Sequence, residues 1–189
     1  PDGATKAAQF IQLCSQSGTP IIYLQNTTGY MVGTAAERAG MVKHGSKMIQ
    51  AVANATVPQI TLVIGGSFGA GNYGMCGRSY DPRFVFAWPG SRIAVMGGEQ
   101  AAKVMEIITL AKFARMGVQG DAESIAAMGN HIKAKLDAES TALYATARLW
   151  DDGIIDPRDS RRVLALALAT CRDAELRKLR PNTFGVARM

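Results

Sequence analysis

The pattern that most constrains this chain is a pair of short apolar runs with a helical stretch between them. The first run covers residues 21–24 after Pro20, and the second covers residues 59–64 after Pro58. Between them, residues 35–53 repeat apolar or small side chains at helical spacing. A strand, a helix and a strand in this order form a βαβ unit, in which the strands are parallel and the crossover is right-handed. The sequence therefore predicts an α/β fold.

Periodicity predicts further helices and strands around this unit. The last helix has the clearest start, because Asp156 is a capping residue and Pro157 suits the first helical position. Leu164, Leu168 and Cys171 then form its apolar stripe. The other predicted elements are a helix over residues 4–17, strands over residues 84–88 and 92–96, a helical region after Gly98, and a long helix from Asp121 whose apolar face continues through Leu143 to Ala147.

Composition favours one globular domain and restricts its partners. The chain has 189 residues, 48% of them hydrophobic, and no apolar run approaches the ~20 residues of a membrane span. The net charge is +6, but the dense basic run at residues 172–180 also contains acidic residues and lacks aromatic ones. We therefore expect a solvated helix end there, and binding neither to nucleic acid nor to a membrane. Cys14, Cys76 and Cys171 are widely spaced, which predicts reduced thiols and no metal site.

The glycine cluster after the second apolar run is the most informative feature for function. Residues 65–71 are Gly-Gly-Ser-Phe-Gly-Ala-Gly, so the backbone can turn sharply and approach a ligand closely. The register fits neither a P-loop nor the dinucleotide-binding fingerprint. If a helix begins near Gly69, its first N–H groups lack intrahelical partners and, aided by the helix dipole, would form an oxyanion hole made of backbone alone. The alternative is a tight turn that only packs a helix against the sheet.

Six segments spread over nearly the whole chain form a more specific pattern when they are taken together. They are residues 25–33 (QNTTGYMVG), 43–48 (KHGSKM), 64–78 (IGGSFGAGNYGMCGR), 87–89 (AWP), 94–102 (AVMGGEQAA) and 147–157 (ARLWDDGIIDP). In content and order they resemble the carboxyltransferase β subunits of biotin-dependent acyl-CoA carboxylases. The stretch at residues 71–78 is similar to the branch that carboxylates 3-methylcrotonyl-CoA or geranyl-CoA.

This resemblance implies a fold and a domain. The expected fold is of the crotonase (ClpP/crotonase) type, an α/β superhelix of ββα units. Residues 1–189 would form the C-terminal crotonase-like carboxyltransferase domain, without its first strands and without the N-terminal domain. In the family that N-terminal domain holds the acyl-CoA thioester. The active site would then form between this half of one subunit and the first half of a partner.

The resemblance also implies a chemistry. The backbone at the catalytic positions Gly69, Ala70 and Gly71 would form the oxyanion hole for the ureido oxygen of biotin. The carboxyl group would move from carboxybiotin to the γ-carbon of a branched α,β-unsaturated acyl-CoA, either 3-methylcrotonyl-CoA or geranyl-CoA. Fixed dipoles would stabilise the charge that develops on oxygen, so no protein general base is required. Further substrate contacts are expected from Phe68, Gly29, Tyr30, Gly97 and Gly98.

The cofactor and the partners follow from the same resemblance. Biotin would be attached covalently to a partner α subunit that carries the biotin carboxylase and the biotin carrier, and ATP and Mg²⁺ would bind only there. Carboxyltransferase dimers would build a homo-oligomer, with α6β6 as the expected assembly. The free thiols and a bacterial style of sequence favour the bacterial cytoplasm, with the mitochondrial matrix as the alternative. Residues 106–116 are more apolar than the charged helix expected of methylcrotonyl enzymes. Residues 179–189 keep the family's Phe-Gly-x-x-Arg-Met ending with altered lead-in residues. Both differences keep the longer geranyl chain open.

Three other interpretations stay open. A propionyl-CoA-type carboxyltransferase would act on a shorter acyl chain. A stand-alone crotonase-type hydratase or isomerase would need a positioned pair of carboxylates, and the glycine-rich turns contain no glutamate pair. A non-catalytic assembly module would suit the Leu/Ala-rich last helix but leaves the glycine cluster unexplained. His44, Lys43, Lys47 and Glu99 are interpreted as packing, solvated or helix-terminal groups rather than catalytic ones.

Overall fold

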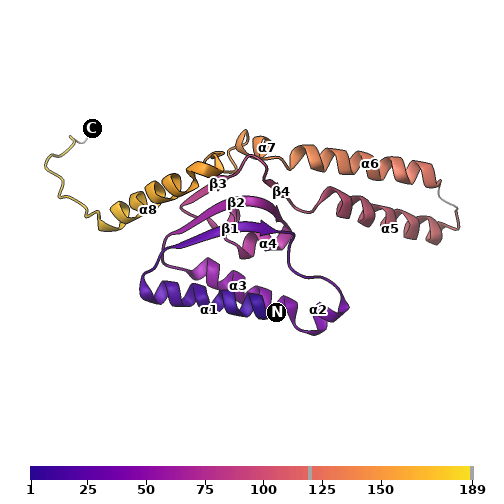
Figure 1. Cartoon of the computed structure of the whole chain (residues 1–189), viewed down its shortest axis with the longest axis horizontal. Coiled ribbons are helices and arrows are strands. Elements are labelled where there is room, and N and C mark those ends of the chain that lie inside the picture. Colours follow the sequence, from indigo (N-terminus) through magenta and orange to yellow (C-terminus); the bar gives the residue numbers. More distant parts are fainter. Residues whose placement is uncertain (119–120, 188–189) are drawn as a thin grey trace.

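The computed structural model describes residues 1–118 and 121–187 and contains a parallel sheet. The sheet has four strands in the order β1-β2-β3, and β4 pairs with the far end of β2. The central strand β2 therefore contacts every other strand (Figure 1). The strands are β1 Ile21–Thr27, β2 Gln59–Phe68, β3 Phe84–Ala87 and β4 Arg92–Ala94. The predicted α/β fold with a parallel βαβ unit is confirmed.

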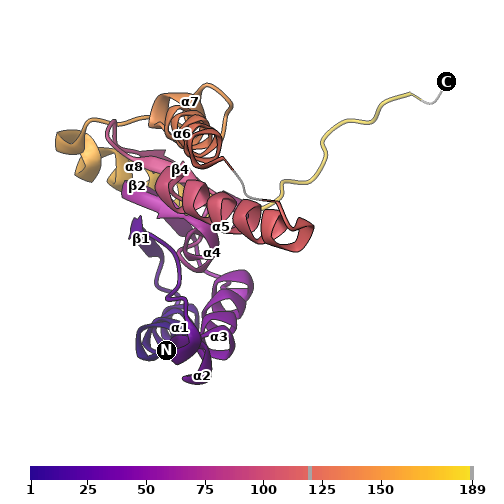
Figure 2. The ribbon, with the colours of Figure 1, turned by 90° about the vertical axis from the view of Figure 1, so that its right-hand side faces the viewer.

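Helices cover both faces of this sheet, and two of them extend away from it. Figures 1 and 2 show α1 and α3 side by side under the sheet, α8 on the other side, and α5 and α6 as a projecting hairpin. The helices are α1 Asp2–Ser17, α2 Thr34–Arg38, α3 Met41–Asn54, α4 Gly69–Gly74, α5 Gly98–Met116, α6 Ala122–Glu139, α7 Ala142–Thr146 and α8 Ser160–Leu176, with 3-10 turns η1 Arg78–Tyr80 and η2 Pro157–Asp159. Among the described residues, no helix is both long and apolar enough to cross a bilayer.

The first core lies between the sheet and the pair α1 and α3. Ile11, Val52 and Cys76 are almost completely buried there, beside Tyr23. The Tyr23 hydroxyl donates to Gln59 Oε1 at 2.8 Å, and Gln59 Nε2 donates to the Val52 carbonyl at 3.1 Å. These two buried bonds join β1, β2 and α3 and satisfy the side-chain polar atoms of Tyr23 and Gln59 within this core.

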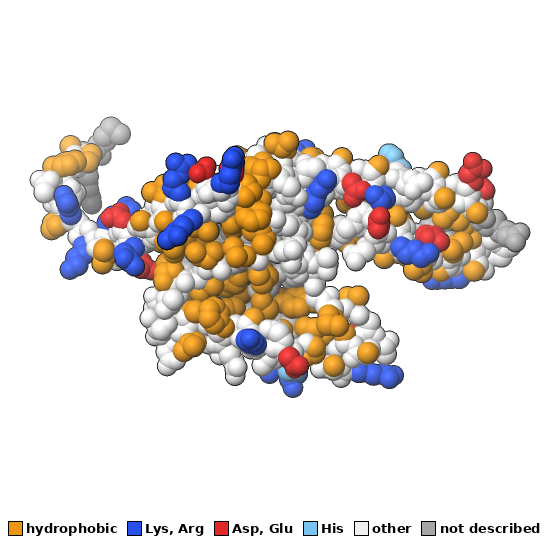
Figure 3. Space-filling view, in the orientation of Figure 1, with side chains coloured by type: hydrophobic (Ala, Val, Ile, Leu, Met, Phe, Trp, Pro, Cys, Tyr) orange, Lys and Arg blue, Asp and Glu red, His pale blue; other side chains and the backbone are white. Residues whose placement is uncertain are grey.

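The second core lies between the opposite sheet face and α8. Ile60 and Leu62 of β2 are 0% and 1% exposed and pack with Ala167 and Cys171 of α8. The predicted stripe of the last helix is therefore confirmed. α8 covers β2 and β3 only, because Ile22 and Leu24 of β1, on the same face, are 38% and 54% exposed. Hydrophobic side chains accordingly gather over the middle of the molecule in Figure 3.

The α5–α6 hairpin is held mainly by contacts between its own two helices. Gly98 permits the closest approach, since a Cβ there would lie 3.0 Å from the Lys133 carbonyl oxygen of α6. Asp121 caps α6 as predicted and accepts from the Ser124 amide at 3.1 Å. Hydrogen bonds from Ser124 hold the pKa of the Asp121 carboxyl below its usual value. The outer side of α5 leaves Val104, Ile107 and Ile108 about half exposed.

Several predicted boundaries are wrong. The strand predicted over residues 59–64 continues to Phe68, and the strand predicted over residues 92–96 ends at Ala94. β1 continues to Thr27, three residues beyond the predicted strand, because Gln25 is buried as the third inward side chain of the strand. The predicted helix over residues 35–53 is two helices, separated at Gly40, whose φ of +82° breaks the helix. The helical pattern over residues 35–53 includes Val42 among its apolar positions. In the structure Val42 is 77% exposed, and the neighbouring Met41 is buried instead.

The C-terminal third differs from the sequence pattern in one place. The long helix ends at Glu139 instead of continuing to Ala147, and Thr141 starts a separate short helix by accepting from the Tyr144 amide at 3.2 Å. Leu143 is 73% exposed there, so the predicted stripe does not reach it. The Asp156 cap is confirmed, although it caps the 3-10 turn that precedes α8. Of the family-like tail, Arg188 and Met189 lie outside the described residues.

The second core generates a stability prediction. Leu62→Ala in the full subunit removes a side chain that is 1% exposed between β2 and α8, where the surroundings cannot collapse freely. We expect a loss of about 2–5 kcal/mol in the free energy of unfolding, measured by urea denaturation. A loss below about 1 kcal/mol would show that α8 does not close this core.

Candidate functional site

The glycines begin inside β2 rather than after it. Gln25 pairs with Val63 and Thr27 pairs with Ser67, so β2 carries two more residues than β1 between these pairs. Gly65 and Gly66 lie in that irregularity. The Asn26 side chain occupies the space where a Cβ of Gly65 would lie, and its Oδ1 accepts from the Gly66 amide at 3.1 Å. Gly65 therefore makes room for a side chain of the neighbouring strand, and Gly66 makes room for the Phe68 ring of its own strand.

The turn itself lies between β2 and α4, as the sequence predicts. Phe68 is extended and Gly69 takes φ of +57°, which favours glycine, and the short helix α4 begins there. Gly71 follows in close contact with the loop after β1. A Cβ on Gly71 would lie 2.8 Å from both Gly29 Cα and Thr27 Oγ1. Gly71 of α4 and Gly29 of the loop after β1 thus meet backbone to backbone.

A hollow of about 400 Å³ opens at the start of α4. Gly69 and Ala70 line it, and Ala70 is exposed. The first N–H groups of a helix have no intrahelical acceptor, which is the basis for expecting that amides at this end of α4 bind an external oxygen. The other lining residues are Asn72, Tyr73, Arg78, Ser79, Ile93, Ala94, Val95 and Trp150. No carboxylate is among them, and their apolar side chains suit a flat organic group.

The remaining predicted site residues lie outside this lining. Tyr30 is packed between α3 and α4, with its ring against Gly45 and Gly74 and its hydroxyl donating to the Gly45 carbonyl at 3.4 Å. Burial raises its pKa, and the neighbouring Tyr80 adds to this. The Phe68 ring lies against Gly66 of its own strand. These positions have structural explanations, and their contact with substrate stays a prediction.

The three glycines predicted to contact substrate have roles in close packing or in starting a helix. Gly29 lies against the Phe68 carbonyl oxygen, 3.6 Å from where its Cβ would be, and against Gly71. Gly97 is the N-cap of α5, and Gly98 is buried against α6. The structure therefore brings together Gly29, Phe68 and the residues of the turn, whereas Gly97 and Gly98 belong to the base of the hairpin.

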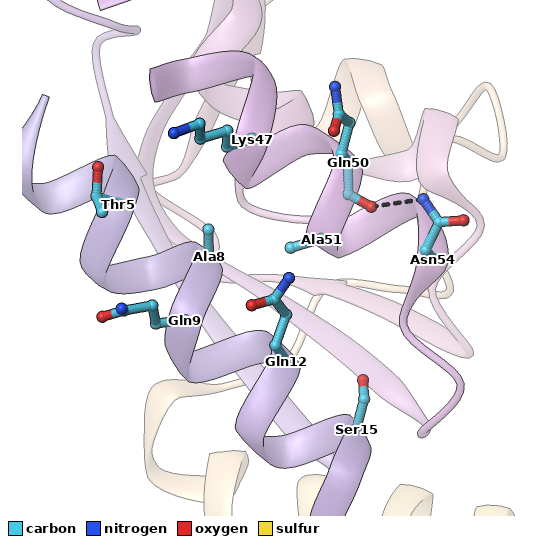
Figure 4. Close-up of a pocket in the computed structure, with 9 residues that line it drawn as sticks. All are labelled: Thr5, Ala8, Gln9, Gln12, Ser15, Lys47, Gln50, Ala51 and Asn54. Carbon is cyan, nitrogen blue, oxygen red and sulfur yellow. Dashed lines mark hydrogen bonds between the residues drawn. The ribbon is translucent and has the colours of Figure 1, made fainter. Parts of the chain in front are cut away.

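The residues interpreted as non-catalytic are not among those that line the hollow. His44 Nδ1 shares a 2.8 Å hydrogen bond with Thr5 Oγ1, which ties α3 to α1. Lys43 and Glu99 are exposed. Lys47 lines a second groove of about 520 Å³ between α1 and α3, shown in Figure 4, together with side-chain amides such as Gln12 and Gln50. This groove shares no residue with the glycine turn.

A buried polar cluster beside the turn is missing from the sequence prediction. Gln25 is 0% exposed and hydrogen-bonds to Ser67 and to α4. Its position in phase with Ile21 and Tyr23 on the inward side of β1 was the available signal, because alternate residues of a strand share a face. The strand predicted over residues 21–24 ends one residue before Gln25 and so leaves it out of this pattern.

Cys76 follows α4 and is not a nucleophile. It is 0% exposed, and burial, with a further effect from Asp81, raises the pKa of its thiol to about 12. The thiolate is the reactive form, so the neutral thiol of Cys76 is inert at physiological pH. Cys14 and Cys171 are also free and buried, and no group of three His, Cys, Asp or Glu side chains among the described residues could hold a metal.

Cys76 provides a chemical test of this burial. We expect the native subunit at pH 8 to leave Cys76 unmodified by iodoacetamide, and guanidinium-unfolded protein to react completely, with peptide mass spectrometry as the measurement. Rapid alkylation of Cys76 in the native subunit would contradict the burial of the segment after α4.

Comparison with known proteins assigns the family. A model of the carboxyl transferase domain matches residues 1–186, so the chain belongs to the carboxyl transferase domain family. Over 188 residues it is 50% identical to the mitochondrial methylcrotonoyl-CoA carboxylase beta chain of Dictyostelium discoideum, covering 100% of this chain and 32% of that one. This confirms the resemblance carried by the six segments.

Solved structures agree with the fold. The geranyl-CoA carboxylase beta subunit of P. aeruginosa is 61% identical with a TM-score of 0.91, and the match covers 100% of this chain and 35% of that one. A transcarboxylase 12S hexamer structure with hydrolysed methylmalonyl-coenzyme A bound is 35% identical with a TM-score of 0.74, covering 97% of this chain and 33% of that one. The carboxyltransferase, crotonase-like fold is therefore confirmed. The chain spans about a third of the length of these relatives.

Proposed function

We propose that this chain is the biotin-facing half of the carboxyltransferase site in a biotin-dependent acyl-CoA carboxylase. The observation that carries the proposal is the hollow at the start of α4, where Gly69 and Ala70 present backbone amides in a chain of the carboxyl transferase family. The apolar side chains around the hollow fit the flat ring of biotin, and the free amides fit its ureido oxygen. Carboxybiotin, when bound, supplies the carboxyl group.

The chain's own contribution is binding and electrostatics. Amides at Gly69, Ala70 and Gly71 would donate to the oxygen on which negative charge increases during transfer, in an orientation set before the reaction starts. Ile93, Val95 and Trp150 would restrict water around that oxygen. Since the lining contains no carboxylate, the hydratase or isomerase alternative, which requires a carboxylate pair, has less support.

The proposed acceptor is the γ-carbon of a branched α,β-unsaturated acyl-CoA, 3-methylcrotonyl-CoA or geranyl-CoA. Support comes from identities of 50% to a methylcrotonoyl-CoA carboxylase chain and 61% to a geranyl-CoA carboxylase chain. Identity falls to 35% for the transcarboxylase that holds hydrolysed methylmalonyl-CoA, which makes the propionyl type the weaker alternative. The acyl-CoA itself would be held by the first half of a partner subunit.

The proposed assembly follows from this shared site. Biotin would arrive on a separate α subunit, which would also bind ATP and Mg²⁺, and the carboxyltransferase subunits would form the core of an α6β6 complex. The hexamer of the transcarboxylase relative supports such a core. A bacterial cytoplasm is the proposed location, with the mitochondrial matrix as the alternative, since the relatives include both bacterial and mitochondrial forms.

The decisive assay combines the full subunit with its biotin-bearing partner. We expect acyl-CoA-dependent loss of the carboxyl group from carboxybiotin, and the comparison of methylcrotonyl-CoA with geranyl-CoA identifies the substrate. Absence of turnover with methylcrotonyl-CoA, geranyl-CoA and propionyl-CoA would refute the carboxyltransferase proposal and favour an assembly module.

Ala70→Val tests the backbone site within that assay. The Ala70 side chain is exposed at the hollow, so the larger β-branched side chain obstructs the amides without entering a core. We expect transfer to fall about 100-fold, the loss that follows removal of one oxyanion donor. Ala53→Val, on an exposed position of α3, is the matched control and should transfer normally. Equal activity of the two variants would refute the proposed hole.

A further inference from the structure

We propose that Gln25 is a positioning residue for the glycine turn and that, with Ser67 and Asn72, it sets where the first amides of α4 point. This inference rests on the proposed function, because it concerns the same amides. Gln25 does not itself line the hollow, but it hydrogen-bonds Asn72, which does. It acts through the backbone that it holds.

The bonds of Gln25 connect the sheet to α4. Its Oε1 accepts from Ser67 Oγ at 2.6 Å and from Asn72 Nδ2 at 3.4 Å. Its Nε2 donates to the Met75 carbonyl at 2.7 Å and to the Asn72 carbonyl at 3.4 Å. One amide group therefore uses both its acceptor and its donor on the segment that surrounds the turn.

Ser67 and Asn72 close this cluster around the amides themselves. Asn72 Nδ2 donates to Ser67 Oγ at 2.8 Å, and Ser67 is 0% exposed. Ser67 lies two residues before Gly69, and Asn72 lies one residue after Gly71. The cluster thus fixes the chain on both sides of the turn, from a point on the neighbouring strand β1.

α4 depends on these bonds because it has almost no apolar anchor. It has six residues, of which only Gly71 and Gly74 are buried, and an isolated helix of this length does not form in water. Its end is held in the same way, since Thr61 Oγ1 donates to the Cys76 carbonyl at 2.6 Å. The polar contacts from β1 and β2 therefore help to set the orientation of α4, together with the packing of Gly71 on Gly29 and of Gly74 on Tyr30.

The way in which the orientation of α4 is held matters for catalysis. Fixed donors lower a barrier only when they already point at the place where charge develops, and displacements near 1 Å are costly in rate. An ordinary core residue would lower stability when altered but would leave the reaction of the folded fraction unchanged. The two roles are therefore separable by experiment.

The main variant is Gln25→Met, which keeps the shape of the side chain and removes its hydrogen bonds. In the full subunit with its biotin-bearing partner, we expect kcat for carboxyl transfer per folded subunit to fall about 10- to 100-fold, with KM for the acyl-CoA nearly unchanged. Amide hydrogen exchange over α4 should accelerate. Ser67→Ala, a smaller change in the same cluster, should show both effects more weakly.

Tyr23→Phe is the matched control. It removes a buried hydrogen bond on the same face of β1, two residues from Gln25, and leaves α4 untouched. We expect a lower unfolding midpoint with normal kcat per folded subunit and normal exchange over α4. A Gln25→Met variant that behaves like Tyr23→Phe in both readouts would overturn the positioning role.

Gln25→Glu adds a pH readout that a purely structural role would not predict. Burial raises the pKa of a carboxyl at this position, and only its neutral form can donate to the Met75 carbonyl. The activity of this variant relative to wild type should therefore fall as pH rises through that pKa. If the activity of Gln25→Glu relative to wild type does not change with pH and equals that of Gln25→Met, the donor role is wrong.

The outcomes separate this inference from the proposed function. If the wild-type complex transfers no carboxyl group, the function fails, and hydrogen exchange over α4 still decides whether Gln25 holds the turn. If wild type transfers and both Gln25→Met and Ser67→Ala keep kcat within about twofold, the function stands and the positioning role is wrong.

Discussion

The pairing of β2 with three other strands is the constraint on which the rest of this structure depends. β2 joins β1 on one side and both β3 and β4 on the other, so its residues face two cores and leave no edge free. Ile60 and Leu62 face α8, while Gln59 and Thr61 face the side of α1, α3 and α4. Because β2 is enclosed in this way, the point at which it ends, and the direction in which α4 begins, are both fixed.

The position of the candidate site follows from that arrangement. Ligands of parallel α/β sheets bind beyond the carboxyl ends of the strands. Here β2 carries the turn at its carboxyl end, and β4 pairs with that end, which brings Ile93 and Ala94 to the hollow. β1 contributes from the other side through the buried amide of Gln25. The hollow is thus built by strands that are distant in sequence and meet only through β2.

Much of this fold could be predicted from the sequence, because apolar runs and helical stripes are local signals. The βαβ unit, the start of α4 at Gly69 and the cap at Asp156 all follow from residues within a few positions. The break at Gly40 could not be predicted, since a glycine within a helical pattern is tolerated. The end of α6 at Glu139 could not be predicted either, because the apolar pattern of the sequence continues past that residue.

The site was predictable in part, for a related reason. A glycine cluster after a strand signals a close backbone approach, but it does not say what approaches. At Gly65 the partner is the Asn26 side chain, at Gly71 it is the backbone of Gly29, and at Gly74 it is the hydroxyl of Tyr30. Only Gly69, with Ala70, opens on the hollow. The sequence also could not reveal the role of Gln25, because its partners Ser67 and Met75 come from far along the chain.

The proposed site of main-chain amides has a consequence for how such proteins are studied. Alanine scanning measures what a side chain does. It cannot test these amides, because Ala70 is already alanine and glycine has no side chain to remove. At Gly71 the added methyl group would collide with Gly29, so the scan would report a packing defect instead of a lost donor. Replacing single amides by esters, which deletes one N–H and keeps every side chain, is the mutation that matches this kind of site. Because the proposed donors of the turn are main-chain N–H groups, only a change to the backbone itself can test them one at a time.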